Sequence, residues 1–140
     1  MKLNDAAREL IGNGADATLV TLNPDGSHQV SVVWVALRST PDGDELVTAH
    51  LAEHKKVRNV RRDPRVAMTI VSTQDPGKAQ RPYLAIEGTA SIEDGGAPEL
   101  LKTLAQTLSD PNVFPPAGAP PGFVTHIRVD KIGGTGPWSS

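Results

Sequence analysis

The side chains with the clearest chemical potential are the Lys and Arg residues gathered between positions 55 and 65. They are Lys55, Lys56, Arg58, Arg61, Arg62 and Arg65, and the acid among them is Asp63. Val57 and Val60 predict a short helix with one buried stripe, and Asp63-Pro64 predicts its end. Because the start of a helix offers free N–H groups, Lys55 and Lys56 in its first turn indicate a seat for phosphate.

Two other interpretations of this basic stretch stay open. Charge runs on short helices are commonly solvated faces without a ligand. Nucleic acid is the other usual partner of clustered cations, but outside residues 55–65 acidic residues clearly outnumber basic ones. A duplex binder usually carries a broader positive footprint, so the sequence favours a local anion site and no nucleic acid.

Weaker signals come from histidine and tryptophan. His50 and His54 are four residues apart and could share a helical face that binds a metal or haem, although no third ligand is evident. Trp34 and Trp138 could cover a flat ring, or could pack in the core and the tail. The chain has no Gly-x-Ser-x-Gly motif and no Gly-rich turn between a strand and a helix, so hydrolase and dinucleotide-binding signatures are absent.

The composition is that of an ordinary globular domain. With 140 residues, a net charge of −2 and 38% hydrophobic residues, we expect one domain over residues 1–140. No apolar run reaches the ~20 residues of a membrane span, and the first residues lack the apolar centre of a signal peptide. The absence of cysteine excludes disulfides, thiolate metal sites and a cysteine nucleophile. These features predict a cytoplasmic protein.

Hydrophobic periodicity predicts the elements that must position the basic helix. A first helix is expected to be capped by Asn4 or Asp5 and to end at Gly12, and another to run from Pro98 to about Leu108. Strands are expected at residues 17–22, 28–37, 45–49, 83–92 and 123–132, with one more after Pro64. A Pro-rich connection is expected at 110–122, and the tail at 133–138 is expected to continue neither kind of element. Six strands joined by tight turns predict antiparallel pairing and closure into a barrel.

Three runs of the sequence resemble the pyridoxamine-phosphate-oxidase-like split β-barrel family, in particular its actinobacterial flavin/deazaflavin oxidoreductases. The runs are TLNPDGSHQVS at 21–31, KVRNVRRDPRV at 56–66 and YLAIEGTA at 83–90. The resemblance covers most of the chain, while the Pro-rich insert and the tail match more loosely. It implies a mainly β (α+β) fold, a six-stranded antiparallel split β-barrel (an FMN-binding split barrel) with short flanking helices.

The resemblance also implies a redox site in a groove between the two subunits of a homodimer. Lys56 matches the family's phosphate-binding lysine, Lys55 replaces a frequent Arg beside it, and Asn59 caps the same pocket. The other implied cofactor-binding residues are Ala49 and His50 at the end of a strand, Gln29, Val30 and Ser31 along the ring, and Trp138 in the tail.

The implied cofactor is coenzyme F420, with FMN as the alternative. His54 stands where many flavin-binding relatives have a phosphate-bonding Ser or Thr, and the tail ends in Gly-Pro-Trp as in the F420 branch. The implied reaction is hydride transfer from reduced F420 to an electron-poor acceptor, a quinone, an enone or a tetrapyrrole, with the proton taken from solvent. The alternative is a non-catalytic carrier of F420, flavin or haem.

Overall fold

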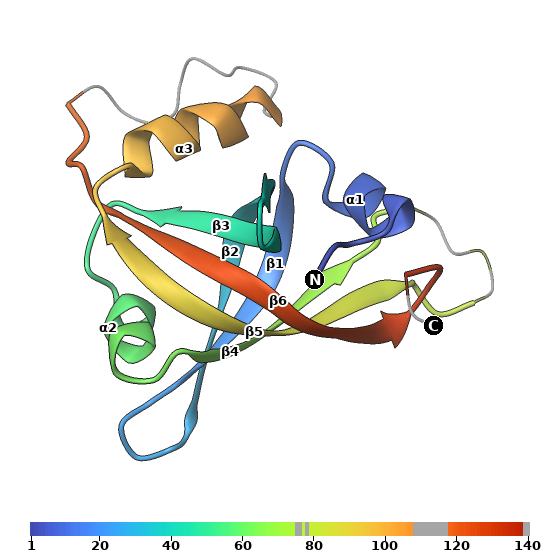
Figure 1. Cartoon of the computed structure of the whole chain (residues 1–140), viewed down its shortest axis with the longest axis horizontal. Helices are drawn as coiled ribbons and strands as arrows, with labels where there is room; N and C mark the ends of the chain where they lie inside the picture. The colour runs from blue at the N-terminus through green and yellow to red at the C-terminus, as the bar shows by residue number, and fades with distance from the viewer. Residues whose placement is uncertain (75–76, 78, 108–117, 139–140) are drawn as a thin grey trace.

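The computed structural model describes residues 1–74, 77, 79–107 and 118–138. Within them, six strands form a closed antiparallel barrel in the order β1-β2-β3-β6-β5-β4 (Figure 1). The strands are β1 (Ala15–Leu22), β2 (His28–Thr40), β3 (Gly43–His50), β4 (Arg65–Val71), β5 (Tyr83–Asp94) and β6 (Phe123–Thr135). They are flanked by the helices α1 (Asp5–Ile11), α2 (Lys55–Arg62) and α3 (Ala97–Leu104), and the 3-10 turn η1 (Ala105–Thr107) follows α3. The predicted mainly β, six-stranded antiparallel barrel with short flanking helices is confirmed.

Alternate residues of the strands fill the barrel, as their period-2 patterns predict. On β4 the buried residues Val66, Met68 and Ile70 alternate with residues that face outward. Each strand supplies at least one fully buried side chain: Leu19, Val35, Leu46, Met68, Ile86 and Ile127. Burying an aliphatic side chain of this size stabilises the folded state by about 1.5–3 kcal/mol, so this interior is the main source of stability.

The helices begin and end at the signals in the sequence. The Asn4 side chain caps α1 by accepting a hydrogen bond of 2.9 Å from the N–H of Ala7. The helix α3 has Pro98 in its first turn and packs Leu100 and Leu104 on the outer side of the sheet. Its expected end near Leu108 and most of the expected Pro-rich connection lie outside the described residues. No helix of the described residues is long and apolar enough to cross a membrane.

The last strand continues further than the sequence predicts. Residues 133–135 were expected to lie beyond it, but they extend β6 and pair with residues 83–85 of β5. Gly134 has a φ of +95°, and a Cβ atom there would lie 2.2 Å from the carbonyl oxygen of Tyr83. The prediction was therefore wrong at these positions, because glycine here permits the close approach of two backbones that the pairing requires.

The wall of the barrel is split between β2 and β3. These strands pair from Val35 and Thr48 to Thr40 and Gly43. Before Val35, β2 pairs with β1, while the end of β3, up to His50, pairs with β6. Among the described residues, 28–33 of β2 therefore pair with a strand on the β1 side alone, and the chain enters α2 soon after β3 ends.

Candidate cofactor-binding site

A pocket of about 320 Å³ opens where β2 and β3 part. Its lining comes from β2, the end of β3, the loop into α2, the first turn of α2, and α3. The lining residues are Val32, Val33, Trp34, Thr48, Ala49, His50, Leu51, His54, Lys56 and Leu101. Of the residues that the sequence analysis predicts for cofactor binding, Ala49, His50 and Lys56 are thus brought together.

Lys56 gives this pocket its positive charge. Partial burial lowers the pKa of its ammonium group below the usual value for lysine, because removal from water disfavours the charged form. His54 is the N-cap residue of α2, and within the described residues no side chain forms a capping hydrogen bond there. The first N–H groups of a helix have no partner inside the helix. In α2 the N–H of Val57 already donates to the carbonyl oxygen of His54 at 3.0 Å, so the donors at this helix start are the N–H groups of Lys55 and Lys56. A cation beside such donors is the chemistry that binds phosphate.

His50 is a neutral, fixed part of the wall. Its side chain is buried, and Nε2 lies 2.8 Å from Oγ1 of Thr125 on β6. Burial, and then the nearby charges of Lys56 and His54, lower the pKa of His50 to about 4. The rings of His50 and His54 stand nearly perpendicular, with 6.3 Å between their centroids. No group of three or more metal-binding side chains occurs in the part of the chain that the structure describes.

Asn59 is directed at the β1–β2 hairpin and is not among the lining residues. Its Nδ2 donates hydrogen bonds to Oγ1 of Thr21 and Oδ1 of Asn23, both at 3.0 Å. Thr21 Oγ1 in turn donates to Oε1 of Gln29 at 3.2 Å. Both amide hydrogens of Asn59 are used in this way, so the residue ties α2 to the hairpin and has no donor left for a phosphate.

The three residues predicted to line the ring divide between the two faces of β2. Val30 points outward and is 59% exposed, whereas Gln29 and Ser31 point inward. Ser31 Oγ is buried and has no hydrogen-bond partner among the described residues. A buried hydroxyl left unpaired costs about 1–3 kcal/mol. None of the three is among the residues that line the pocket, which begins on β2 at Val32. The edge of β2 that faces away from β1 could bond to a ligand with polar ring atoms, so the site fits the predicted heteroaromatic ring.

Lys55 and Trp138 lie away from the pocket within one chain. Lys55 is exposed on the hairpin side of α2. There it adds to the hydrogen bonds from Ser27 that lower the pKa of Asp25. Trp138 is buried and donates from Nε1 to the carbonyl oxygen of Tyr83 at 2.8 Å. The C-terminal end lies near α1, across the barrel from α2 (Figure 1).

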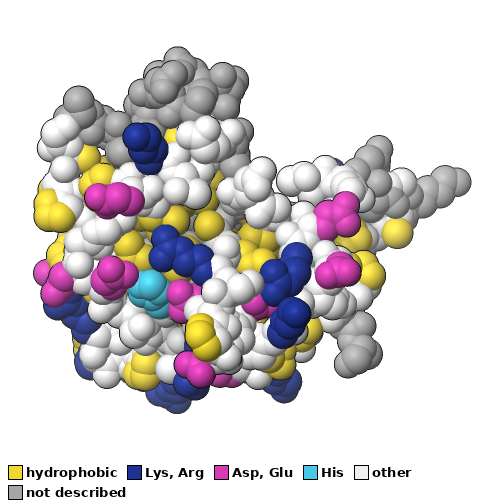
Figure 2. All heavy atoms as spheres, turned by 45° about the horizontal axis from the view of Figure 1, so that its top comes forward, with side chains coloured by type: hydrophobic (Ala, Val, Ile, Leu, Met, Phe, Trp, Pro, Cys, Tyr) yellow, Lys and Arg dark blue, Asp and Glu magenta, His cyan; other side chains and the backbone are white. Residues whose placement is uncertain are grey.

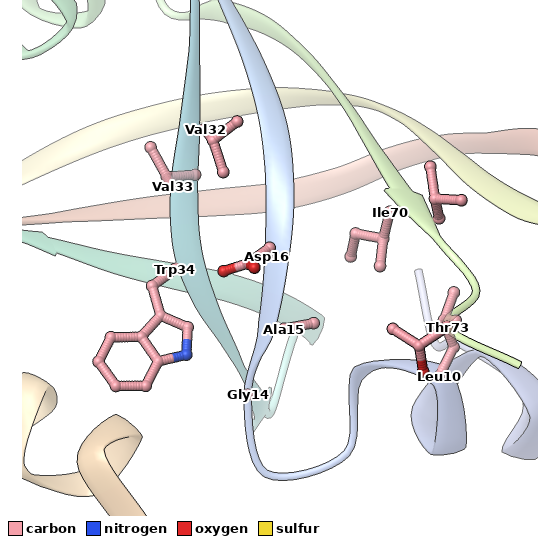
Figure 3. A pocket seen from close by; sticks show the side chains of 10 residues that line it. Leu10, Gly14, Ala15, Asp16, Val32, Val33, Trp34, Ile70 and Thr73 are labelled. Carbon is pink, nitrogen blue, oxygen red and sulfur yellow. The ribbon is translucent and has the colours of Figure 1, made fainter. Parts of the chain in front are cut away.

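A second pocket, which sequence reasoning missed, adjoins the first. It has a volume of about 620 Å³ and shares Val32, Val33 and Trp34 with the smaller pocket. Figure 3 shows Trp34 and Asp16 on one side of it and residues of β4 and α1 on the other. Its walls come from segments far apart in the sequence, so no local pattern indicates it. The one residue that could have indicated this pocket is Trp34, a large aromatic side chain among the small and β-branched residues of its strand.

The surface charge is mixed. On the face shown in Figure 2, basic and acidic side chains are interspersed with apolar ones. Arg61 and Arg65 form ion pairs with Asp94 and Asp63, each at 2.7 Å. Two of the six basic residues of the stretch are thus paired with acidic ones, in contrast to the continuous positive surface of a typical duplex-binding protein.

Comparison with known proteins agrees with the fold. The family model for pyridoxamine 5'-phosphate oxidase matches residues 3–134, and no curated protein matches the chain. Among solved structures, an F420 reductase is 23% identical with a TM-score of 0.67, and the match covers 90% of this chain and 94% of that one. A putative pyridoxamine 5'-phosphate oxidase from Listeria innocua is 21% identical with a TM-score of 0.66, covering 93% of this chain and 95% of that one.

The heme storage protein HutZ from Vibrio cholerae is 14% identical with a TM-score of 0.62, and the match covers 96% of this chain and 95% of that one. At such identities these structures show a shared fold and nothing finer. The family model, in contrast, matches almost the full length of this chain. The chain, with its barrel split beside a basic helix, belongs to the pyridoxamine 5'-phosphate oxidase family.

Proposed function

We propose that this protein is an F420H2-dependent reductase that transfers a hydride from the deazaflavin to an electron-poor organic acceptor. The observation that carries the proposal is the Lys56 ammonium group beside the uncapped start of α2, inside the pocket at the split of the barrel. Membership of an oxidoreductase family supports an enzyme. The similarity to an F420 reductase, together with His54 at the N-cap position, supports F420 over FMN.

The residues of the pocket supply binding and position. Lys56 and the first N–H groups of α2 would hold the phosphate by charge-assisted hydrogen bonds. The edge of β2 that faces away from β1 would meet the polar atoms of the ring, and Trp34 and Val32 would cover its apolar part. His50, neutral near pH 7, adds no charge to this surface. When bound, the deazaflavin supplies the hydride, and the protein supplies orientation and electrostatics.

Titration of the purified protein with F420 and, separately, with FMN tests the cofactor assignment. We expect F420 fluorescence to change saturably and F420 to bind more tightly than FMN. If FMN binds more tightly than F420, FMN is the cofactor, and the assignment of the binding site is unchanged. If neither binds with a Kd below roughly 100 µM, about −5.5 kcal/mol, the proposal is overturned.

Turnover separates an enzyme from a carrier. Reduced F420 is mixed with protein and a panel of quinones and enones, and its oxidation is followed by absorbance. Oxidation that depends on the protein supports the reductase. Tight F420 binding without oxidation of the reduced form by any acceptor favours a cofactor carrier, and saturable haem binding that displaces F420 favours a haem-binding role, as in HutZ.

We also propose that the active form is a homodimer. The outward side chains of β2, β1 and β4, with Ala85 of β5, form an uncharged face, and Glu87 of β5 marks its edge. Its paired positions are Val32, Thr18, Thr69 and Ala85 in one row and Val30, Val20 and Ala67 in the next. Val30 and Val32 are 59% and 69% exposed. An exposed uncharged sheet face of this kind is typical of a subunit interface.

A further inference from the structure

The 620 Å³ pocket, called here the second pocket, is large enough for a small molecule of its own. Ligand pockets commonly measure ~300–1,000 Å³, and this one falls in that range. It adjoins the Lys56 pocket, because Val32, Val33 and Trp34 line both. Molecules in the two pockets would therefore both contact this stretch of β2.

The walls of the second pocket suit a flat apolar ring. Most of the lining is aliphatic or aromatic: Leu10, Ala15, Val32, Val33, Trp34, Ile70 and Val71. In Figure 3 the Trp34 indole stands on one side, and Ile70, Leu10 and Thr73 stand across the space from it. An indole wall favours offset or edge-on contact with a planar ring.

The charge of the second pocket comes from a carboxylate. All ten lining residues are described, and Asp16 is the charged residue among them, with no Lys or Arg to neutralise it. Asp16 lies on β1 directly opposite Trp34 on β2. In Figure 3 its carboxylate lies on the same side of the pocket as the indole. The two neighbouring pockets thus carry opposite charge: the first is positive at Lys56, and the second is negative at Asp16.

We propose that the second pocket binds the acceptor and that Asp16 makes it selective for uncharged or cationic planar acceptors over anionic ones. A negative group on the ligand would be repelled by Asp16, whereas a quinone or enone without charge would not. Tetrapyrroles that carry propionate groups are disfavoured for the same reason. That the bound molecule is a hydride acceptor rests on the proposed function; the charge preference is a binding property of the chain itself.

The test measures binding in the absence of F420. The probes are 1,4-naphthoquinone and 1,4-naphthoquinone-2-sulfonate, a neutral and an anionic form of the same ring, and the signal is quenching of tryptophan fluorescence. In the unmodified protein we expect the neutral quinone to bind at least about fivefold more tightly than the sulfonate, the preference that one nearby charge in water can produce. Asp16→Asn should reduce this preference to less than about twofold, and Asp16→Lys should reverse it.

Two controls tie the result to this pocket. Asp42→Asn removes an exposed carboxylate on the β2–β3 turn, outside the pocket lining, and should leave the preference unchanged. Trp34→Phe should abolish the saturable quenching, since Trp138 lines neither pocket. The proposal is overturned if the neutral quinone gives no saturable quenching, or if both Asp16 variants keep the original preference. Failure of F420 to bind would contradict the proposed function but would not change the relative affinities for the two quinones. The two failures are therefore distinguishable.

Discussion

At the scale of single residues, Lys55 and Lys56 show how one helical step separates a binding residue from a surface charge. Lys56 lines the pocket and has a lowered pKa, while Lys55 is exposed on the hairpin side. The sequence analysis assigned both to phosphate, because a run of two lysines does not reveal which one faces inward. Burial by the neighbouring strands decides this, and those strands are distant in sequence.

The Lys56→Ala variant should weaken F420 binding by about 1.5–3 kcal/mol, the usual contribution of a hydrogen bond to a charged group. Lys55→Ala, the matched control, should cost no more than about 1 kcal/mol, because exposed charges are screened by solvent. The Kd of each variant is measured by fluorescence titration. Equal losses in the two variants would mean that the phosphate is held elsewhere.

The buried imidazole of His50 should make stability depend on pH. Its pKa is about 4 in the folded protein, against an ordinary value of 6.5, so between these values the unfolded state binds the proton and the folded state does not. This contribution to stability is present above pH 6.5 and is lost as the pH falls toward 4. We expect His50 to lower the free energy of unfolding by about 2 kcal/mol from pH 7 to pH 5. His126 acts in the opposite direction, because its pKa is raised: partial burial opposes this, but the hydrogen bonds to Glu45 and Glu93 outweigh it.

Urea denaturation at the two pH values measures this change. His50→Gln should remove the fall in stability due to His50, because glutamine can keep a hydrogen bond to Thr125 without titrating in this range. His28→Gln, at an exposed position of the hairpin, should retain it. A pH dependence that survives in His50→Gln would assign the effect to other groups.

At the scale of elements, the junction between α2 and the β1–β2 hairpin determines where the pocket lies. Sequence reasoning located α2 well, since Val57, Val60 and the Asp63-Pro64 end are local signals, and the structure has the helix at Lys55–Arg62. It assigned Asn59 to the pocket because the run at 56–66 resembles the family motif. The amide instead bonds to Thr21 and Asn23, about 40 positions earlier, a contact that no periodicity within the helix could indicate.

Asn59→Ala should therefore reduce stability more than it reduces cofactor affinity. It leaves the buried Thr21 and the half-buried Asn23 without their donor, which should lower the free energy of unfolding by about 1–3 kcal/mol. Asn13→Ala, at an exposed position after α1, should change it by less than about 0.5 kcal/mol. If Asn59→Ala loses as much F420 affinity as Lys56→Ala and its stability is unchanged, Asn59 would be assigned to phosphate binding.

At the scale of the whole molecule, the uncharged face of β2, β1 and β4 accounts for the proposed homodimer. Ala67 is exposed on this face, between Val20 of β1 and Glu87 of β5, which marks the edge of the uncharged part. Ala67→Arg should place a charge in the interface and convert dimer to monomer, halving the mass measured by light scattering after gel filtration. Gln106→Arg, an exposed change in η1, should leave the mass unchanged. A monomer in the unmodified protein would end this proposal.

The closed barrel could be predicted from the sequence because tight turns and alternating strands make antiparallel closure the simplest outcome. The split between β2 and β3 could not be derived from the strand pattern alone. It depends on where pairing stops, and Val35 and Thr48 show no special pattern at that point. The second pocket escaped prediction for the same reason, since four separate elements must meet to form it.

The edge of β2 that faces away from β1 lies beside the pocket, and the outward residues Val30 and Val32 of this strand belong to the uncharged face. If the dimer forms there, ligand binding and subunit pairing both involve strand β2. If the ligand binds the dimer more tightly than the monomer, it must strengthen subunit pairing by the same factor, and dilution of the protein must weaken ligand binding. Affinities measured at nanomolar and at micromolar protein would in that case differ.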